Sequence, residues 1–364
     1  MILKELTSYL DSVVPLSFQE DYDNAGLQVG LPEKDITSAL LTIDVTEDVI
    51  DEAIRGKSDL VISHHPLIFN GVKKITGRTY VERIILKAII NNIAIYSSHT
   101  NLDIFDGGVS RKMAEKLRLI DIRVLSPLKN NLLKLIVYVP ESHIDSVRSA
   151  VFEAGAGVTG NYDNCGFAAG GTGSFRGNEN SNPFTGIRGE LHFEKEIRFE
   201  TILHSHLKPE VVKAMLKAHP YEEVAYDIFL LQNEDEHNGL GCVGEFAESV
   251  GEKDFLELLS VCFNQKGIRY SDLTGRAVKK VALCGGAGSS LLNRAISSGA
   301  DAFVTGDIKY HNFFDADKKL LLVDAGHFET EKYSTEILYD LIIKKFPKFA
   351  LRFSETNTNP INYL

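Results

Sequence analysis

The order of apolar and polar positions predicts an α/β fold for the first and last thirds of the chain. Near the start, apolar residues recur at helical spacing and predict an amphipathic helix. Short apolar runs that end in polar residues follow, separated by helical segments, which is typical of strands in an α/β sheet. The runs are ALLTID, DLVISHH and IAIYSSH in the first third, and VKKVALCGG, AFVTGD and KLLLVDAGH in the last.

The pattern changes between roughly Asn131 and Asn238. The strand-like LLKLIVYVP, GFAAGGTGSF, IRFETILHS and EVAYDIFLL are interrupted by the helical HIDSVRSAVFEAG and PEVVKAMLKAH, in the order βαββαβ. This order predicts a ferredoxin-like α+β module. Because the two ends of a compact insertion often lie close together, the flanks can form one discontinuous domain. We therefore expect an α/β domain from residues 1–128 and 241–364, with an inserted domain at 129–240.

Polar residues at the ends of the predicted strands form a candidate metal site. Ligands of open α/β sheets gather at the carboxyl ends of the strands. His64 and His65 stand between an apolar run and Pro66, and Asp103 follows the next run. His327 and Glu331 are four residues apart, so on a helix they share one face. The alternatives are one core and one solvated histidine, and an ordinary solvated helix face.

Five nitrogen and oxygen donors suit two adjacent divalent cations better than one. We assign the bridging carboxylate to Glu331, which would also make it a catalytic residue. Zinc is the first expectation for the metal, with iron or manganese as alternatives, because all three accept imidazole and carboxylate ligands. A pair of such cations activates water and polarises a substrate oxygen, so hydrolysis is the expected reaction class.

Other strand-end residues are secondary candidates. Asp44 and His99 could orient a ligand or relay a proton, or could make ordinary capping hydrogen bonds. His311 could act as an acid or base and Lys309 could contact phosphate, or both could be surface residues. The glycine-rich CGGAGSS, residues 284–290, could present N–H groups to a phosphate or form a tight turn.

Composition restricts the class of protein. The chain has 364 residues and a net charge of −11, which argues against broad nucleic-acid or membrane-surface affinity and favours a small-molecule substrate. Its four cysteines form no close pair, so neither a cysteine zinc site nor a disulfide framework is expected. Without a signal peptide or an apolar run long enough to span a bilayer, a cytoplasmic location is expected.

Five motifs together resemble the GTP cyclohydrolase 1 type 2 homologue family, also described as Nif-three-like dinuclear-metal proteins. They are DNAGLQVG, SHHPLIF, SHTNLD, TGDIKYH and GHFETE. The resemblance covers nearly the whole chain and implies a discontinuous Nif-three-like α/β domain. It also implies metal ligands at His64, His65, Asp103, His327 and Glu331.

In the inserted domain, HPYEEVAYD at residues 219–227 is similar to PII-like and CutA-like modules. The resemblance therefore implies a homohexamer made from two trimers.

The expected function is that of a dinuclear metal-dependent hydrolase. By family resemblance the nucleotide-like substrate would be GTP, with metal-bound hydroxide attacking C8 of the guanine ring, opening the imidazole and releasing formate. Glu331, His99 and His311 are the candidate catalytic residues. The alternative is a non-enzymatic metal-binding regulatory or trafficking protein whose PII-like domain senses a ligand.

Overall fold

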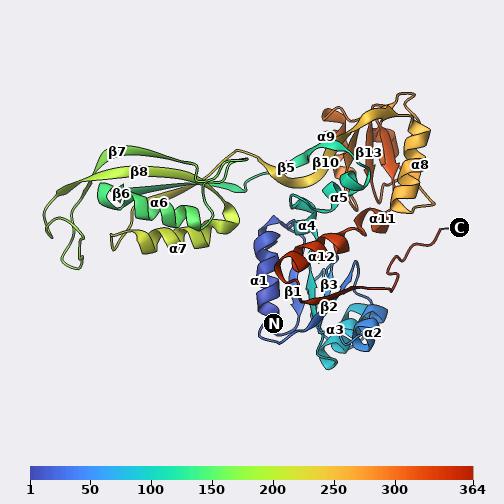
Figure 1. Ribbon diagram of the computed structural model, residues 1–364, viewed down its shortest axis with the longest axis horizontal. Coiled ribbons are helices and arrows are strands. Elements are labelled where there is room, and N and C mark those ends of the chain that lie inside the picture. Colours follow the sequence, from blue (N-terminus) through green and yellow to red (C-terminus); the bar gives the residue numbers. More distant parts are fainter. Residues whose placement is uncertain (364) are drawn as a thin grey trace. The chain divides into compact units, whose positions relative to one another are not determined.

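The computed structural model describes residues 1–363, which form two compact units (Figure 1). Residues 1–127 and 236–364 make up the larger unit, and residues 128–235 make up the inserted unit. Each unit has hydrophobic cores of its own. The two units are described separately below.

The first sheet of the larger unit has the strand order β1-β4-β3-β2-β15. Strand β1 is antiparallel to β4, and the other neighbours are parallel. Both faces of the sheet are covered at its centre, which explains why β2, β3 and β4 read as continuous apolar runs. The strands are β1 (Gly26–Val29), β2 (Ser38–Thr42), β3 (Leu60–Ser63), β4 (Ala94–Ser97) and β15 (Ala350–Phe353).

Helices α2 (Glu47–Arg55) and α3 (Tyr80–Ile90) pack on one face of this sheet, and α1 (Leu3–Val13) and α12 (Ser334–Lys345) pack on the other. Leu40 and Val61 face α2 and α3, whereas the neighbouring Leu41 contributes to the opposite core. The strand period of two therefore divides the apolar residues between two cores. The helix predicted at the start of the chain and the α/β class are confirmed.

The second sheet of the larger unit has the order β11-β14-β13-β12-β10-β5, with β12, β13 and β14 parallel. Its strands are β5 (Ile120–Leu128), β10 (Asp235–Val250), β11 (Arg269–Tyr270), β12 (Val278–Leu283), β13 (Ala302–Thr305) and β14 (Leu321–Asp324). The remaining helices of this unit are α4 (Thr100–Ile104), α5 (Val109–Lys116), α8 (Glu252–Phe263), α9 (Leu292–Ser297), α10 (Asn312–Asp315) and α11 (His327–Glu331). Short 3-10 helices lie at Leu16–Phe18 and Ser289–Leu291.

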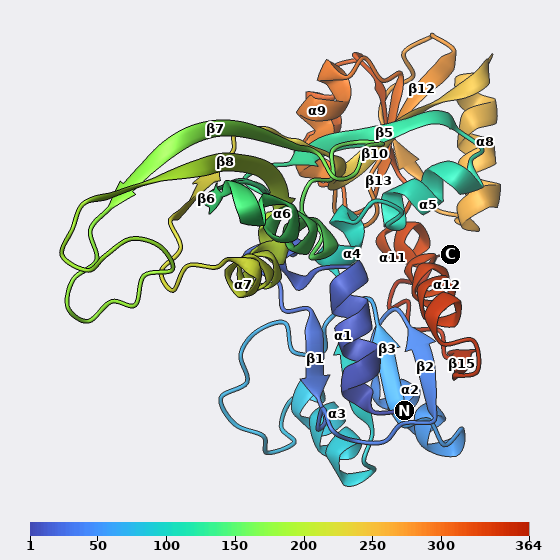
Figure 2. The same cartoon turned by 60° about the vertical axis from the view of Figure 1, so that its left-hand side comes forward.

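The inserted unit has the βαββαβ order that the sequence predicts. Its elements are β6 (Leu132–Pro140), α6 (Ile144–Glu153), β7 (Gly166–Phe175), β8 (His192–His204), α7 (Lys208–Ala218) and β9 (Tyr226–Leu230), with 3-10 turns at Glu141–His143 and Ser205–Leu207. The sheet has the antiparallel order β7-β8-β6-β9. Figure 2 shows β7, β8 and β6 side by side. Val137 on β6 packs against Val147 on α6 and Met215 on α7. The relation to PII-like and CutA-like modules stays a prediction.

Among the described residues, no helix has the length and apolar character that crossing a membrane requires.

Candidate metal centre

Two histidines, His64 and His65, follow directly after the end of strand β3 and lie close together. The strand ends at Ser63, and the backbone N–H groups of His64 and His65 then donate to the carbonyls of Thr42 and Ile43, at 3.2 and 2.9 Å. The Ser63 hydroxyl donates to the His65 carbonyl at 2.8 Å. This tight turn ends the alternation of side chains, so the two rings lie 5.1 Å apart instead of on opposite faces.

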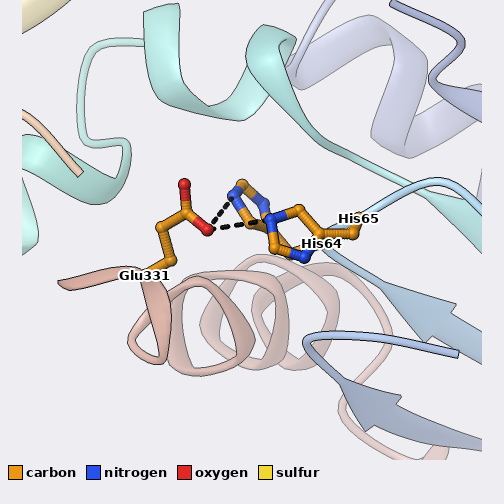
Figure 3. A group of neighbouring side chains, drawn as sticks. All are labelled: His64, His65 and Glu331. Atoms are coloured by element: carbon orange, nitrogen blue, oxygen red, sulfur yellow. Dashed lines mark hydrogen bonds and ion pairs between the residues drawn. The ribbon is translucent and has the colours of Figure 1, made fainter. Parts of the chain in front are cut away.

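Glu331, on α11, meets these histidines (Figure 3). Its buried Oε2 lies 2.8 Å from Nε2 of His65, 2.9 Å from Nε2 of His327 and 3.8 Å from Nε2 of His64. The ligand atoms that His64, His65 and Glu331 offer all lie within 4.8 Å of one another, so this group can hold a metal ion. The helical spacing of four residues places His327 beside Glu331, as predicted.

The candidate ligands His64, His65, Asp103, His327 and Glu331 are here called the cluster. Two buried polar atoms in the cluster have no hydrogen-bond partner among the described residues. They are Nε2 of His64 and Oδ1 of Asp103, which lie 3.7 Å apart. A buried donor or acceptor without a partner costs about 1–3 kcal/mol, so native proteins rarely leave one unsatisfied. An imidazole nitrogen and a carboxylate oxygen are both ordinary ligands of divalent metals. The donor set therefore fits a cation at this position.

Each histidine is held by its second nitrogen. Nδ1 of His64 lies 2.9 Å from the Ser98 carbonyl, and Nδ1 of His65 lies 2.7 Å from Oδ1 of Asp44. Nδ1 of His327 lies 2.8 Å from Oδ2 of Asp307. In all three histidines an oxygen atom therefore lies beside Nδ1. Oxygen partners at Nδ1 fix the proton there and leave Nε2 free to bind a metal.

The charges of the cluster shift its pKa values in the metal-free protein. Burial alone would lower the pKa of His65, but its bonds to Asp44 and Glu331 raise that pKa to about 10. The pKa of His327 rises to about 9, because its contact with Glu331 outweighs burial. Burial raises the pKa of Asp103, whereas the three histidines hold that of Glu331 far below its usual value despite its burial. Positive charge on His65 and His327 thus balances the carboxylates when no cation is present.

His99 lies at the edge of the cluster. Its ring is 5.4 Å from that of His64 and 5.3 Å from that of His65, and it lines the adjoining cavity. Its Nδ1 lies 2.8 Å from Oδ1 of Asp23, whose side chain is fully buried and whose Oδ2 accepts the Thr100 N–H. Sequence reasoning missed Asp23, although it begins the DNAGLQVG motif. The catalytic role of His99 stays a prediction.

His311 is not brought to the cluster. It is exposed, its ring packs beside Tyr310 with centroids 5.2 Å apart, and it is absent from the residues that line the cavity. Lys309 is exposed as well. Strand β13 ends at Thr305, and the five residues between Thr305 and His311 carry His311 past the carboxyl edge of the sheet.

The glycine-rich segment after β12 makes a tight turn against the cluster. Gly286 has a φ of +59°, and a Cβ built there would lie 1.9 Å from Oε1 of Glu331. The N–H groups of Gly286 and Gly288 donate to the hydroxyls of Thr330 and Thr305, at 3.0 and 2.8 Å. Both N–H groups are therefore engaged within the protein, which favours the interpretation as a turn over a phosphate loop.

A cavity of about 530 Å³ opens beside the cluster. Two exposed aromatic side chains line this cavity. They are Tyr22, which is 63% exposed, and Phe69, which is 44% exposed, and their ring centroids lie 6.2 Å apart. The side-chain amide of Asn24 donates to the Ile68 carbonyl at 2.6 Å, and this bond joins the segment that carries Tyr22 to the segment that carries Phe69. The remaining lining residues are Glu20, His65, Pro66, His99, Thr100, Asp103, Leu240, Cys284, Gly285, Ala287, Gly288, Ser290, Leu291, His327 and Glu331.

The sequence profile of Duf34/NIF3 (NGG1p interacting factor 3) matches residues 1–360. The chain belongs to the Duf34/NIF3 family. Two relatives, both called GTP cyclohydrolase 1 type 2 homolog, are similar over most of their length. The protein from Bacillus subtilis is 38% identical over 99% of this chain and 98% of its own. The protein from Halalkalibacterium halodurans is 44% identical over 86% of this chain and 85% of its own.

Two solved structures share the fold of this chain. The crystal structure of a Bacillus cereus protein related to NIF3 superposes with a TM-score of 0.86 at 38% identity, and covers 100% of this chain and 99% of its own. A Staphylococcus aureus protein superposes with a TM-score of 0.79 at 28% identity, with the same coverage. The resemblance found in the sequence motifs is thereby confirmed.

Proposed function

We propose that this protein is a hydrolase that depends on two divalent cations. The observation that carries the proposal is the buried pair of Nε2 of His64 and Oδ1 of Asp103, which have no hydrogen-bond partner among residues 1–363. One cation would be held by these two residues and Glu331. The other would be held by His65, His327 and Glu331, since Nε2 atoms of the two histidines are 3.3 Å apart and both contact Oε2 of Glu331.

Divalent cations in such a site lower the pKa of water and polarise a substrate oxygen, which is the chemistry that hydrolysis needs. The chain itself supplies a group that can hold or move a proton. Because Asp23 holds Nδ1 of His99 at 2.8 Å, the other ring nitrogen, Nε2, is available to the cavity. Asp23 thus fixes the orientation of His99 and favours the proton on its Nδ1.

The proposed substrate is a nucleotide, with GTP first. The names of the relatives from B. subtilis and H. halodurans point to this substrate class. The cavity supports it, because its volume of about 530 Å³ suits a small molecule and the rings of Tyr22 and Phe69 can stack against a planar base. Zinc is the first metal to test, followed by iron and manganese.

The test is hydrolysis of nucleotides by protein loaded with each metal in turn. Formate and ring-opened product are measured by mass spectrometry with GTP, and other nucleotides are screened for any hydrolysis. The Glu331→Gln variant is expected to lose turnover, whereas Glu336→Gln, which removes an exposed carboxylate on α12, is expected to retain it. Metal-loaded protein that hydrolyses no nucleotide would instead favour the regulatory or trafficking alternative.

We also propose that the chain assembles as a homohexamer of two trimers through its inserted units. Helices α6 and α7 pack on the face of the inserted sheet that carries Val137. The ladder registers place Phe167 and Phe229 on the opposite face, where they are 65% and 52% exposed. Phe167 on β7 and Phe229 on β9 belong to the two edge strands of the sheet, where each can contact a neighbouring copy of the chain. Light scattering that gives the mass of one chain would contradict this assembly.

A further inference from the structure

The segment of residues 354–359, here called the strap, runs along the edge of the first sheet and toward the metal centre. Strand β15 ends at Phe353, and the Ser354 N–H extends its pairing by donating to the Leu41 carbonyl at 2.8 Å. Glu52, on α2, then accepts the hydroxyls of Ser354 and Thr356 at 2.6 and 2.7 Å. The first half of the strap is therefore held on the sheet by several hydrogen bonds to one carboxylate.

The second half of the strap reaches residues that contact or flank the candidate ligands. The Thr358 hydroxyl donates to Oδ2 of Asp44 at 2.9 Å, and Oδ1 of the same carboxylate is 2.7 Å from Nδ1 of His65. The Asn359 side-chain amide donates to Oε1 of Glu329 at 2.9 Å. Glu329 is buried on α11, between the candidate ligands His327 and Glu331. The strap thus bonds to one residue that contacts a candidate ligand and to another that lies between two candidate ligands in the sequence.

These contacts restrict the rotation of the His65 ring. A carboxylate that makes one hydrogen bond can turn about its side-chain bonds, whereas one held at both oxygens has a defined plane. The ring of a metal-binding histidine takes its orientation from the oxygen that accepts its second N–H. Asp44 is about one-third exposed, with 33% of its side-chain surface accessible, so water can replace Thr358 but with less directional constraint.

We propose that Thr358 is a positioning residue of the metal centre, which acts through Asp44 on the orientation of His65. The proposal rests on the proposed metal-binding function, and it concerns a residue that does not touch the metal. The strap sets the geometry of His65 from a point 314 residues away from Asp44 in the chain. Loss of the Thr358 hydroxyl therefore changes the affinity for metal without removing any ligand.

The chain offers a matched control. Thr358→Val and Thr356→Val each remove one hydroxyl from a half-buried threonine of the strap, but only Thr358 donates to Asp44. The dissociation constants for zinc and cobalt are measured by competition with a chromophoric chelator, and the visible absorption of the cobalt-loaded protein reports the ligand geometry. Thr358→Ser restores the hydroxyl.

The expected result is a metal affinity about 3- to 10-fold weaker in Thr358→Val, at the low end of the effects of supporting partners. The cobalt spectrum should change with it, Thr356→Val should match the wild type, and Thr358→Ser should recover most of the affinity. Equal affinity in wild type and Thr358→Val would overturn the proposal, and so would equal losses in both valine variants. If the wild type itself binds no metal, the proposed function fails instead. Thermal melts of the metal-free variants establish that each one folds.

Discussion

A single methyl group at position 286 should disable the metal centre without removing any ligand. Gly286 packs against Glu331, and an added Cβ would lie 1.9 Å from Oε1 of that carboxylate. The oxygen would have to retreat by about 1.5 Å to restore the 3.4 Å of an ordinary contact. Because both oxygens belong to one rigid carboxylate, such a movement also displaces Oε2, which lies 2.8 Å from His65 and 2.9 Å from His327.

The size of the effect follows from how little displacement a metal site tolerates. Ligand distances in metal sites vary by only about 0.2 Å, so a shift of about 1.5 Å would remove the proposed bridging carboxylate from its position. Loss of a supporting partner costs about 10- to 100-fold in affinity, and loss of a ligand should cost more, so Gly286→Ala should weaken metal binding by at least about 100-fold. The left-handed backbone adds about 1–2 kcal/mol of destabilisation.

The control for this variant is Gly299→Ala. Gly299 also has a left-handed φ, +75° against +59° for Gly286, but nothing lies within 4 Å of a Cβ built there. Both variants therefore incur a similar backbone cost, and only Gly286→Ala displaces a ligand. Metal affinity is measured by chelator competition and stability by thermal melting. If Gly286→Ala binds metal as tightly as Gly299→Ala, the assigned position of Glu331 in the centre is wrong.

Three further predictions concern the same cluster. Asp103→Ala should lower the metal content from about two to about one per chain, because in the proposed centre each cation would have its own ligands besides Glu331; unchanged content by elemental mass spectrometry would contradict this. The pKa values of about 10 for His65 and about 9 for His327 mean that both ring nitrogens of each residue are protonated at pH 7 in the metal-free protein. Metal binding should therefore release protons, and the affinity for metal should increase as pH rises. The calorimetric enthalpy of binding should then differ between phosphate and Tris buffers, and equal enthalpies would argue against this release. His99→Gln should lower kcat by about 100-fold or more with metal content unchanged, as expected for a proton-transfer group, and an unchanged kcat would remove His99 from the mechanism.

Much of the fold, and the convergence of His64, His65 and Glu331, could be predicted because the signals are local. Strand β3 is one apolar run, and the proline after His65 marks its end, so the position of the histidine pair at the sheet edge follows from a few residues. His327 and Glu331 share a helix face by their spacing alone. In the inserted unit, the alternation of strand-like and helical segments was enough to give the βαββαβ order that the structure has.

Asp44 could be selected from the sequence as a residue that orients a ligand. The other supporting contacts could not be predicted, because they join residues that are far apart in the sequence. Asp23 meets His99 across 76 residues, and Thr358 meets Asp44 across 314. Gly286 matters because of the carboxylate beside it, a neighbour that no local pattern indicates. His311 is the opposite case, a residue that the sequence pattern selects but that the structure does not bring to the cluster. It follows a strand end as the ligands do, but the intervening residues carry it away from the cavity lining.

The most direct test of the central claim is the metal content of gently purified protein, measured by elemental mass spectrometry beside the Glu331→Ala variant. The buried pair of His64 and Asp103 and the convergence of His65 and His327 on Glu331 predict about two equivalents per chain, lost in the variant. A wild-type protein that contains almost no metal, and takes up none when zinc, iron or manganese is added, would contradict the account.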